Sequence, residues 1–262
     1  MKNRYLLGID IGGSGVKGGV VDLEIGELTT KRKRIPTPQP STPENVASVV
    51  KQIVDHFADQ VDPDLPVGIT IPAIVLHGVT ASAANIDQSW VNAPAAEIFS
   101  EALGRPVVLV NDADAAGLAE VRWGAAKGHP GMVIVTTLGT GIGSALVYRG
   151  VLVPNTELGH IEIDGHDAET RAAASVKKRE ELSYEEYIPR LQRYYETLEF
   201  LFSPDLFVVG GGISKESENF LPFLKLRAPI IPAKLRNAAG IVGAAAYAAD
   251  WLKDTQAADE EQ

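Results

Sequence analysis

A strand, a glycine-rich turn and a second strand occur twice in this chain, and this repetition constrains the fold more than any other feature. In residues 5–22, two apolar runs flank Gly12, Gly13 and Gly15. In residues 132–148 the same order returns about 127 residues later. A repeat at so long a spacing indicates an internally duplicated, two-domain architecture rather than a solenoid of short repeats.

The segment after each glycine turn decides what kind of phosphate site the turn can form. A dinucleotide-binding fingerprint requires a helix directly after its glycines, and here the chain resumes as an extended run. This excludes the Rossmann interpretation. Glycine lets backbone N–H groups approach an anion, and Ser14 and Thr140 add a hydroxyl at matching places. A plain tight hairpin is the alternative for one copy, but the second copy favours phosphate binding.

These two hairpins supply the predicted phosphate-binding residues. The first contributes Gly12, Gly13, Ser14, Gly15 and Lys17, and the second contributes Thr137, Gly139, Thr140 and Gly141. Asp10, at the end of the first strand, is the predicted ligand for Mg²⁺ carried by the phosphates.

Other segments predict helices and buried strands around the hairpins. Thr42 and Pro43 are suited to an N-cap and a first helical residue, and the apolar spacing after them predicts a helix that reaches Phe57. Ser183 and Glu186 form a capping-box pattern before a second amphipathic helix, which extends to residue 202. Strands are expected at 29–35, 66–71, 107–110, 151–153 and 206–209.

The chain has 262 residues, enough for two halves that each bury a core. We expect a small N-terminal α/β domain over 1–112, closed by a C-terminal helix at 240–252. A large α/β domain is expected over 113–239, with a cleft between the two domains. Residues 253–262 are predicted to form a flexible acidic tail.

Composition excludes several functional classes. The chain has no cysteine, so disulfides, thiolate zinc sites and cysteine nucleophiles are ruled out. Its formal net charge of −10 argues against nucleic acid as a partner. The basic clusters Lys31–Arg34 and Lys177–Arg179 are interpreted first as solvated surface. Without a signal-peptide pattern or a long apolar run, we expect a cytoplasmic protein with no membrane contact.

Three further motifs make a family resemblance specific. They are Asn111-Asp112-Ala113-Asp114-Ala115, a run from Glu157 to Glu169 that opens Glu157-Leu-Gly-His160, and Val209-Gly-Gly-Gly-Ile213-Ser. Together with the two hairpins, they resemble the ROK sugar kinases over nearly the whole chain, and most closely the polyphosphate glucokinase and polyphosphate/ATP glucomannokinase branch. The resemblance implies an α/β fold of the actin/hexokinase (ribonuclease H-like) type, duplicated, with an interdomain cleft.

The resemblance also implies roles for single residues. Asp112 is the general base, and a helix N-cap is its structural alternative. Asn85 and Asn111 are sugar-binding asparagines. Glu157 and His160, one helical turn apart, bind the same sugar, although a structural histidine is the alternative for His160.

The last sugar-binding glutamate is less well defined, because in the family it follows a cysteine-rich zinc loop that this chain lacks. Glu169 is the first candidate and Glu162 the second. Without cysteines, no zinc is expected. Gly210, Gly211 and Gly212 correspond to the segment that contacts the adenosine, with a plain strand-to-helix turn as the alternative.

The implied reaction is transfer of the terminal phosphoryl group of polyphosphate, ATP or both to the 6-hydroxyl of glucose, with Mg²⁺. Mannose remains open as an acceptor, and a homodimer is the family expectation. Lys17, Lys215 and Lys177–Arg179 are candidates for a polyphosphate track. The alternatives are an ATP-only hexokinase or fructokinase of the family, a non-catalytic sugar sensor, and an actin-like assembly protein.

Overall fold

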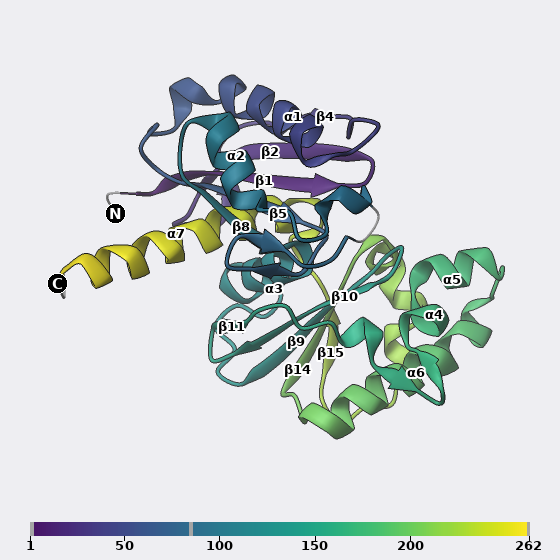
Figure 1. Ribbon diagram of the computed structural model, residues 1–262. Coiled ribbons are helices and arrows are strands. Elements are labelled where there is room, and N and C mark those ends of the chain that lie inside the picture. The colour runs from purple at the N-terminus through teal and green to yellow at the C-terminus, as the bar shows by residue number, and fades with distance from the viewer. Residues whose placement is uncertain (1–2, 84–85, 261–262) are drawn as a thin grey trace. The chain divides into compact units, whose positions relative to one another are not determined.

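The computed structural model describes residues 3–83 and 86–260 of the chain (Figure 1). These residues form two compact units. Unit 1 consists of Met1–Ala119 with Asn237–Gln262, and unit 2 consists of Glu120–Arg236. Each unit contains its own mixed sheet and its own buried core.

Unit 1 is built on a sheet in the order β3-β2-β1-β5-β8, with β4 also pairing with β2. The meander β1–β2 is antiparallel, whereas β5 lies parallel to both β1 and β8. The strands are β1 (Tyr5–Gly12), β2 (Gly15–Asp22), β3 (Glu27–Leu28), β4 (Lys33–Ile35), β5 (Val67–Ile71) and β8 (Val107–Asn111). A small separate hairpin pairs β6 (Val75–Leu76) with β7 (Val79–Thr80).

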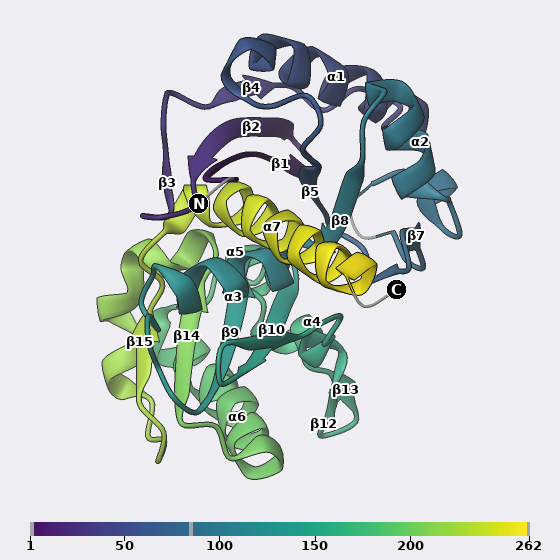
Figure 2. The same ribbon diagram turned by 90° about the vertical axis from the view of Figure 1, so that its left-hand side faces the viewer.

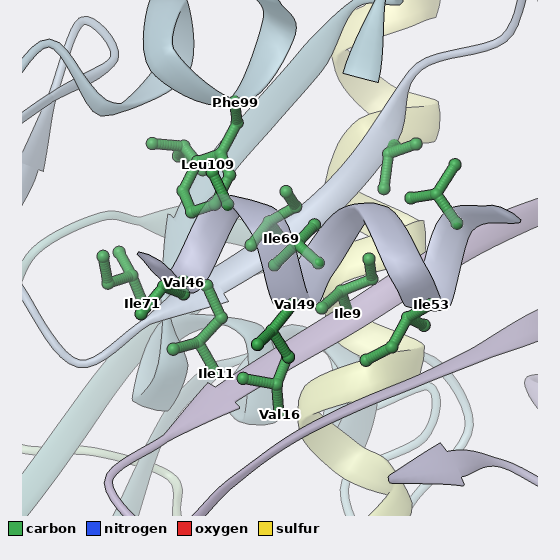
Figure 3. Close-up of a cluster of buried hydrophobic side chains, with 14 of the residues drawn as sticks. Ile9, Ile11, Val16, Val46, Val49, Ile53, Ile69, Ile71, Phe99 and Leu109 are labelled. Carbon is green, nitrogen blue, oxygen red and sulfur yellow. The ribbon is translucent and has the colours of Figure 1, made fainter. Parts of the chain in front are cut away.

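The helices α1 (Pro43–His56) and α2 (Ala95–Leu103) cover one face of this sheet. The predicted start of α1 is confirmed, because the Thr42 side chain accepts a hydrogen bond from Asn45 N and Pro43 is the first helical residue. Figure 3 shows the core between helix and sheet, where Ile9 and Val16 lie with Val49 and Ile53 of α1. The alternation of the strands therefore sends these apolar side chains toward α1.

The opposite face of the sheet carries α7 (Ala239–Glu260), drawn in yellow in Figure 2. Two glycines allow this close packing. A Cβ atom at Gly8 would lie 2.0 Å from the Ile241 carbonyl oxygen, and one at Gly68 would lie 2.0 Å from the Ala244 carbonyl oxygen. The helix continues to Glu260, beyond the predicted helical end at residue 252.

Unit 2 repeats the pattern with a sheet in the order β11-β10-β9-β14-β15. Its strands are β9 (Met132–Leu138), β10 (Ile142–Tyr148), β11 (Val151–Val153), β14 (Leu206–Gly210) and β15 (Ile230–Pro232). A small hairpin pairs β12 (Glu162–Ile163) with β13 (His166–Asp167). Its helices are α4 (Glu169–Ala172), α5 (Ala174–Arg179) and α6 (Tyr184–Phe202). Helix α3 (Asp112–Arg122) begins in unit 1 after β8 and ends in unit 2.

Local sequence signals account for much of this arrangement. The capping box of Ser183 and Glu186 is present at the start of α6, as predicted. Both strand–turn–strand copies are confirmed as antiparallel hairpins. The extended run expected at 29–35 is shorter, since only Lys33–Ile35 forms β4. Short 3₁₀ turns occur at Ala58–Gln60, Gln88–Trp90, Leu158–His160, Gly212–Asn219, Leu221–Phe223 and Arg236–Ala238.

Across residues 3–83 and 86–260, no helix combines the length and the apolar character needed to cross a bilayer.

Candidate active site

The first glycine turn is a two-residue connection at the tip of β1 and β2. Pairing continues to Gly12 and Gly15, which leaves Gly13 and Ser14 as an exposed turn. Thr37 Oγ1 donates a hydrogen bond to the Gly12 carbonyl at 2.5 Å. The segment that follows β4 therefore holds the base of the turn while its tip stays open to a ligand.

Asp10 lies beside this turn with both carboxylate oxygens in hydrogen bonds. Lys17 Nζ lies 2.9 Å from Asp10 Oδ2, and Thr70 Oγ1 donates to Asp10 Oδ1 at 3.1 Å. Mg²⁺ prefers oxygen ligands and usually binds through one or two carboxylates together with substrate phosphates and water. A single carboxylate next to the turn that is predicted to bind phosphate fits that requirement.

The second glycine turn, in unit 2, has one more residue than the first. Leu138 pairs with Ile142, so residues 139–141 form the turn, and Thr140 is exposed at its tip. Ser175 of α5 holds the turn, because its amide donates to the Gly139 carbonyl at 2.9 Å and its hydroxyl donates to the Thr140 carbonyl at 2.5 Å. The two turns thus share the strand framework but are held by different neighbours.

The glycine run that begins at the last residue of β14 lies next to this second turn, since Gly210 pairs with Thr137. Gly211 has φ +81° and approaches the β9 backbone so closely that a Cβ would lie 2.2 Å from the Leu138 carbonyl oxygen. Glycine is therefore required there for structural reasons alone. Around Gly212 a Cβ would meet nothing within 4 Å, so that position leaves space for a ligand to approach.

At the carboxyl end of β8, the two neighbours Asn111 and Asp112 behave differently. Asn111 is buried, and its Oδ1 accepts hydrogen bonds from Ala113 N at 2.8 Å and Asp114 N at 3.2 Å. Its Nδ2 donates to the Ala73 carbonyl at 3.2 Å. Asn111 thus caps α3 through its side chain. Asp112 is exposed, with Oδ1 accepting from Ala113 N at 2.9 Å.

In unit 2, three residues predicted to bind sugar form one cluster. Glu157 immediately precedes the 3₁₀ turn Leu158–His160, and His160 N donates to the Glu157 carbonyl at 3.0 Å. Glu169 lies close enough to act electrostatically on both residues. Asp167 joins the cluster, with its Oδ2 2.8 Å from His160 Nδ1.

The charges in this cluster shift two pKa values. Burial raises the pKa of the Glu157 carboxyl; His160 opposes the rise and Glu169 adds to it. The hydrogen bond to the Asp167 carboxylate raises the pKa of His160, and the nearby carboxylates of Glu169 and Glu157 act in the same direction. Perturbed titratable groups held close together are typical of ligand-binding sites.

The chain is similar in sequence and in structure to known proteins. The model of the ROK family matches residues 6–174.

The chain belongs to the ROK family.

Individual ROK relatives are similar over most of the chain. The polyphosphate glucokinase of Mycobacterium tuberculosis is 48% identical over 243 residues, covering 92% of this chain and 90% of the relative. The solved inorganic polyphosphate/ATP-glucomannokinase from Arthrobacter sp. strain KM is 57% identical, with a TM-score of 0.89, and the match covers 94% of this chain and 99% of that one. A ROK glucokinase from Streptomyces griseus, solved with glucose and AMPPNP, matches with 26% identity and a TM-score of 0.79 over 92% and 98% of the two chains. The predicted actin/hexokinase-type α/β fold is confirmed.

The ROK resemblance left two glutamates as candidates for the last sugar ligand. Glu169 is half-buried within the cluster, and its Oε2 accepts a hydrogen bond from Ile142 N at 3.0 Å. It therefore also supports the second glycine turn. Glu162 is exposed in β12. Asn85, the other predicted sugar ligand, lies outside the described residues.

The cluster of His160, Asp167 and Glu169 lacks the donor set that is typical of structural zinc sites. Ligand atoms of His160, Asp167 and Glu169 lie within 4.8 Å of one another. Structural zinc sites in proteins use four ligands dominated by thiolate and imidazole. Here the candidate ligands are one imidazole and two carboxylates. Each carboxylate is already hydrogen-bonded, Asp167 with His160 and Glu169 with Ile142 N.

Asp167 and Arg34 contact predicted site residues, and sequence reasoning gave neither of these contacts. Asp167 lies seven residues after His160 in an unremarkable acidic stretch, and only the β12–β13 hairpin brings it back to the imidazole. Arg34 belonged to a basic cluster interpreted as solvated surface, yet its Nη2 donates to the Ser14 carbonyl at 3.0 Å. The cluster's composition carried no signal for that contact.

A cavity of about 360 Å³ lies in unit 2 between the β12–β13 hairpin, α4 and α6. It is lined by apolar side chains and by the charged or polar residues Asp164, His166, Arg171, Arg190 and Arg193. None of the predicted sugar ligands of unit 2 lines it. We therefore do not assign it to the sugar.

Proposed function

We propose that this chain is a glucokinase that transfers the terminal phosphoryl group of inorganic polyphosphate or ATP to the 6-hydroxyl of glucose. The observation that carries the proposal is the grouping of Glu157, His160 and Glu169 in a chain 48% identical to a polyphosphate glucokinase. The identity of 57% to a polyphosphate/ATP-glucomannokinase supports both donors, and supports mannose as a second acceptor.

Asp112 is proposed as the general base. Phosphoryl transfer needs little covalent chemistry from the protein, so positioning and charge stabilisation dominate. A carboxylate that accepts the hydroxyl proton must be reachable by the sugar, and Asp112 is exposed at the start of α3. The cap formed by Asn111 fixes the backbone on which that carboxylate stands.

Glu157 and His160 are proposed to bind glucose hydroxyls. The Asp167 hydrogen bond occupies His160 Nδ1, so Nε2 is the ring nitrogen left for a hydroxyl. The carboxyl of Glu157 is half-buried and accepts no capping hydrogen bond in its own turn. A fixed imidazole and a half-buried carboxyl provide the directional polar contacts that sugar recognition requires.

The two glycine turns are proposed to bind the donor phosphates. Gly13, Ser14 and Thr140 are exposed at the tips of the turns. Mg²⁺ near Asp10, when bound, would neutralise phosphate charge. Lys17 contributes a positive charge from the neighbouring strand, and its ion pair with Asp10 keeps the two side chains in register.

The test is formation of glucose 6-phosphate with Mg²⁺, using ATP and long-chain polyphosphate in parallel and the Asp112→Asn variant as the blank. Activity with both donors is expected. Activity with ATP alone would identify an ATP-dependent hexokinase of the same family. Glucose binding without turnover on either donor would contradict the kinase and favour a sugar sensor.

A cytoplasmic homodimer is proposed on the ROK resemblance alone. Sedimentation velocity at micromolar concentration tests the oligomeric state, and a single species at the monomer mass would contradict it.

A further inference from the structure

Three charged side chains lie in a row on one face of the unit 1 sheet. Asp10 on β1 is directly opposite Lys17 on β2, and Lys17 is directly opposite Arg34 on β4. Directly opposed residues of neighbouring strands place their side chains on the same face. Gly8, two residues before Asp10, approaches the backbone of Ile241, so this is the face that carries α7.

Arg34 lies on the first glycine turn rather than in open solvent. Its Nη2 donates to the Ser14 carbonyl at 3.0 Å. A Cβ at Gly15 would lie 2.8 Å from both Nε and Nη2 of Arg34, so the guanidinium occupies the space that a side chain there would take. Gly15 is not among the residues with positive φ. Glycine is thus needed at this position to admit Arg34.

Arg32 extends the row toward the start of α7. It is two residues before Arg34, just before β4 begins. Its Nη1 donates to the carbonyl of Asn237 at 3.1 Å, just before α7 begins. The first turn of α7 lies beside Asp10, since a Cβ at Gly240 would be 3.0 Å from Asp10 Cγ.

Both arginines keep most of their hydrogen-bonding capacity. Within residues 3–83 and 86–260, each donates to a backbone carbonyl and neither forms an ion pair with a carboxylate. A guanidinium carries several N–H donors arranged to bind phosphate oxygens in pairs. Although the chain has a net charge of −10, the positive charges of these two arginines create a local positive potential that attracts polyanions.

We propose that Arg34 and Arg32, the arginine strip, bind inner phosphates of a linear inorganic polyphosphate while its terminal phosphate occupies the first glycine turn. The arginine strip rests on the proposed kinase function, and it would favour polyphosphate over ATP as the donor. In ATP the phosphates end after three groups and a nucleoside follows. In polyphosphate the charge continues, so only polyphosphate can use the whole strip.

The test compares KM for long-chain polyphosphate and for ATP in Arg34→Ala and Arg32→Ala variants. Each substitution is expected to raise KM for polyphosphate about tenfold, the loss typical of one charge-assisted hydrogen bond. KM for ATP is expected to rise by a clearly smaller factor, because Arg34 also contacts the first glycine turn but ATP has no further phosphates that could use the whole strip. Equal effects on both donors would overturn the proposal.

Lys33→Ala is the matched control. It removes the same charge from the same strand, but Lys33 is opposite Gly18, which faces α1 through Ile53. Both KM values are expected to remain within about twofold of wild type. A polyphosphate defect in Lys33→Ala as large as in Arg34→Ala would mean that overall charge, not the strip, attracts the donor.

Gly15→Ala provides an independent variant that keeps every charge. The new methyl group displaces the Arg34 guanidinium, so KM for polyphosphate is expected to rise while the melting temperature remains close to wild type. Unchanged use of polyphosphate would contradict a role for the observed Arg34 position.

Calorimetric titration of polyphosphate into Asp112→Asn protein separates this proposal from the kinase function. Binding that weakens about tenfold when Arg34→Ala is added supports the strip, even if neither donor supports turnover. Turnover with ATP but no measurable polyphosphate binding would overturn the strip and leave an ATP-dependent kinase.

Discussion

His160 and Asp167 form a hydrogen-bonded pair in unit 2, with 2.8 Å between Nδ1 and Oδ2. The partners belong to separate short elements, the 3₁₀ turn Leu158–His160 and strand β13. The pair therefore orients the imidazole and leaves Nε2 for a ligand. It also makes the charge state of His160 depend on Asp167.

Asp167→Asn is expected to lower the pKa of His160. The hydrogen bond to the Asp167 carboxylate is the main cause that raises this pKa above the ordinary value of 6.5. A raised folded-state pKa contributes stability that is fully present below about pH 6.5 and is lost as pH rises through the folded-state value. The stability difference between wild type and Asp167→Asn should therefore be larger at pH 5.5 to 6 than at pH 9, by these same principles.

NMR titration of the His160 ring measures that pKa directly. Asp164→Asn is the control, because Asp164 lies in the same segment but pairs with Arg193. A His160 midpoint that is the same in wild type and in Asp167→Asn would contradict the pairing.

Asp112→Asn is expected to lower kcat by about 10²–10⁴ while glucose affinity stays within about tenfold, because a general base acts mainly in the transition state. Steady-state kinetics and glucose titration give the two quantities. Asp59→Asn, at another exposed aspartate of unit 1, should leave both unchanged. Turnover of Asp112→Asn at the wild-type rate would refute the assignment.

Glu169 is expected to have two separable roles. Glu169→Ala removes the acceptor for Ile142 N and should cost about 1–3 kcal/mol of unfolding free energy, measured by urea denaturation. Glu169→Gln keeps an acceptor oxygen, so stability should be nearly retained, whereas glucose affinity should fall about tenfold with the lost charge.

Glu162→Gln is the comparison for that experiment, since Glu162 is the exposed competitor for the same role. If Glu162→Gln weakens glucose binding and Glu169→Gln does not, the last sugar ligand is Glu162.

Gly8→Ala is expected to destabilise unit 1 by about 3 kcal/mol, because the added methyl group would meet the Ile241 carbonyl of α7, which cannot move alone. Gly19→Ala is the control. There a Cβ would lie 2.8 Å from Leu28 Cδ2, the end of a flexible side chain. Urea midpoints that are equal for the two variants would contradict the close packing of α7.

Much of the fold was predictable because its signals are local. The two hairpins follow from apolar runs interrupted by glycine, and the start of α6 follows from Ser183 and Glu186. The motif around Asp112 and the Glu157–His160 spacing identify the segments that we propose as the site. Each of these signals lies within a few residues of the feature that it specifies.

Contacts between distant segments were decided by the tertiary structure. Sequence spacing could not show that Asn111 caps α3 while Asp112 is exposed, because that depends on how β8 ends against Ala73. Sequence spacing also could not show that the Arg34 guanidinium packs against Gly15. That contact requires β4 to pair with β2 in one particular register. Periodicity and turn chemistry determine elements, whereas strand order and register determine which side chains meet, and those depend on packing of the whole unit.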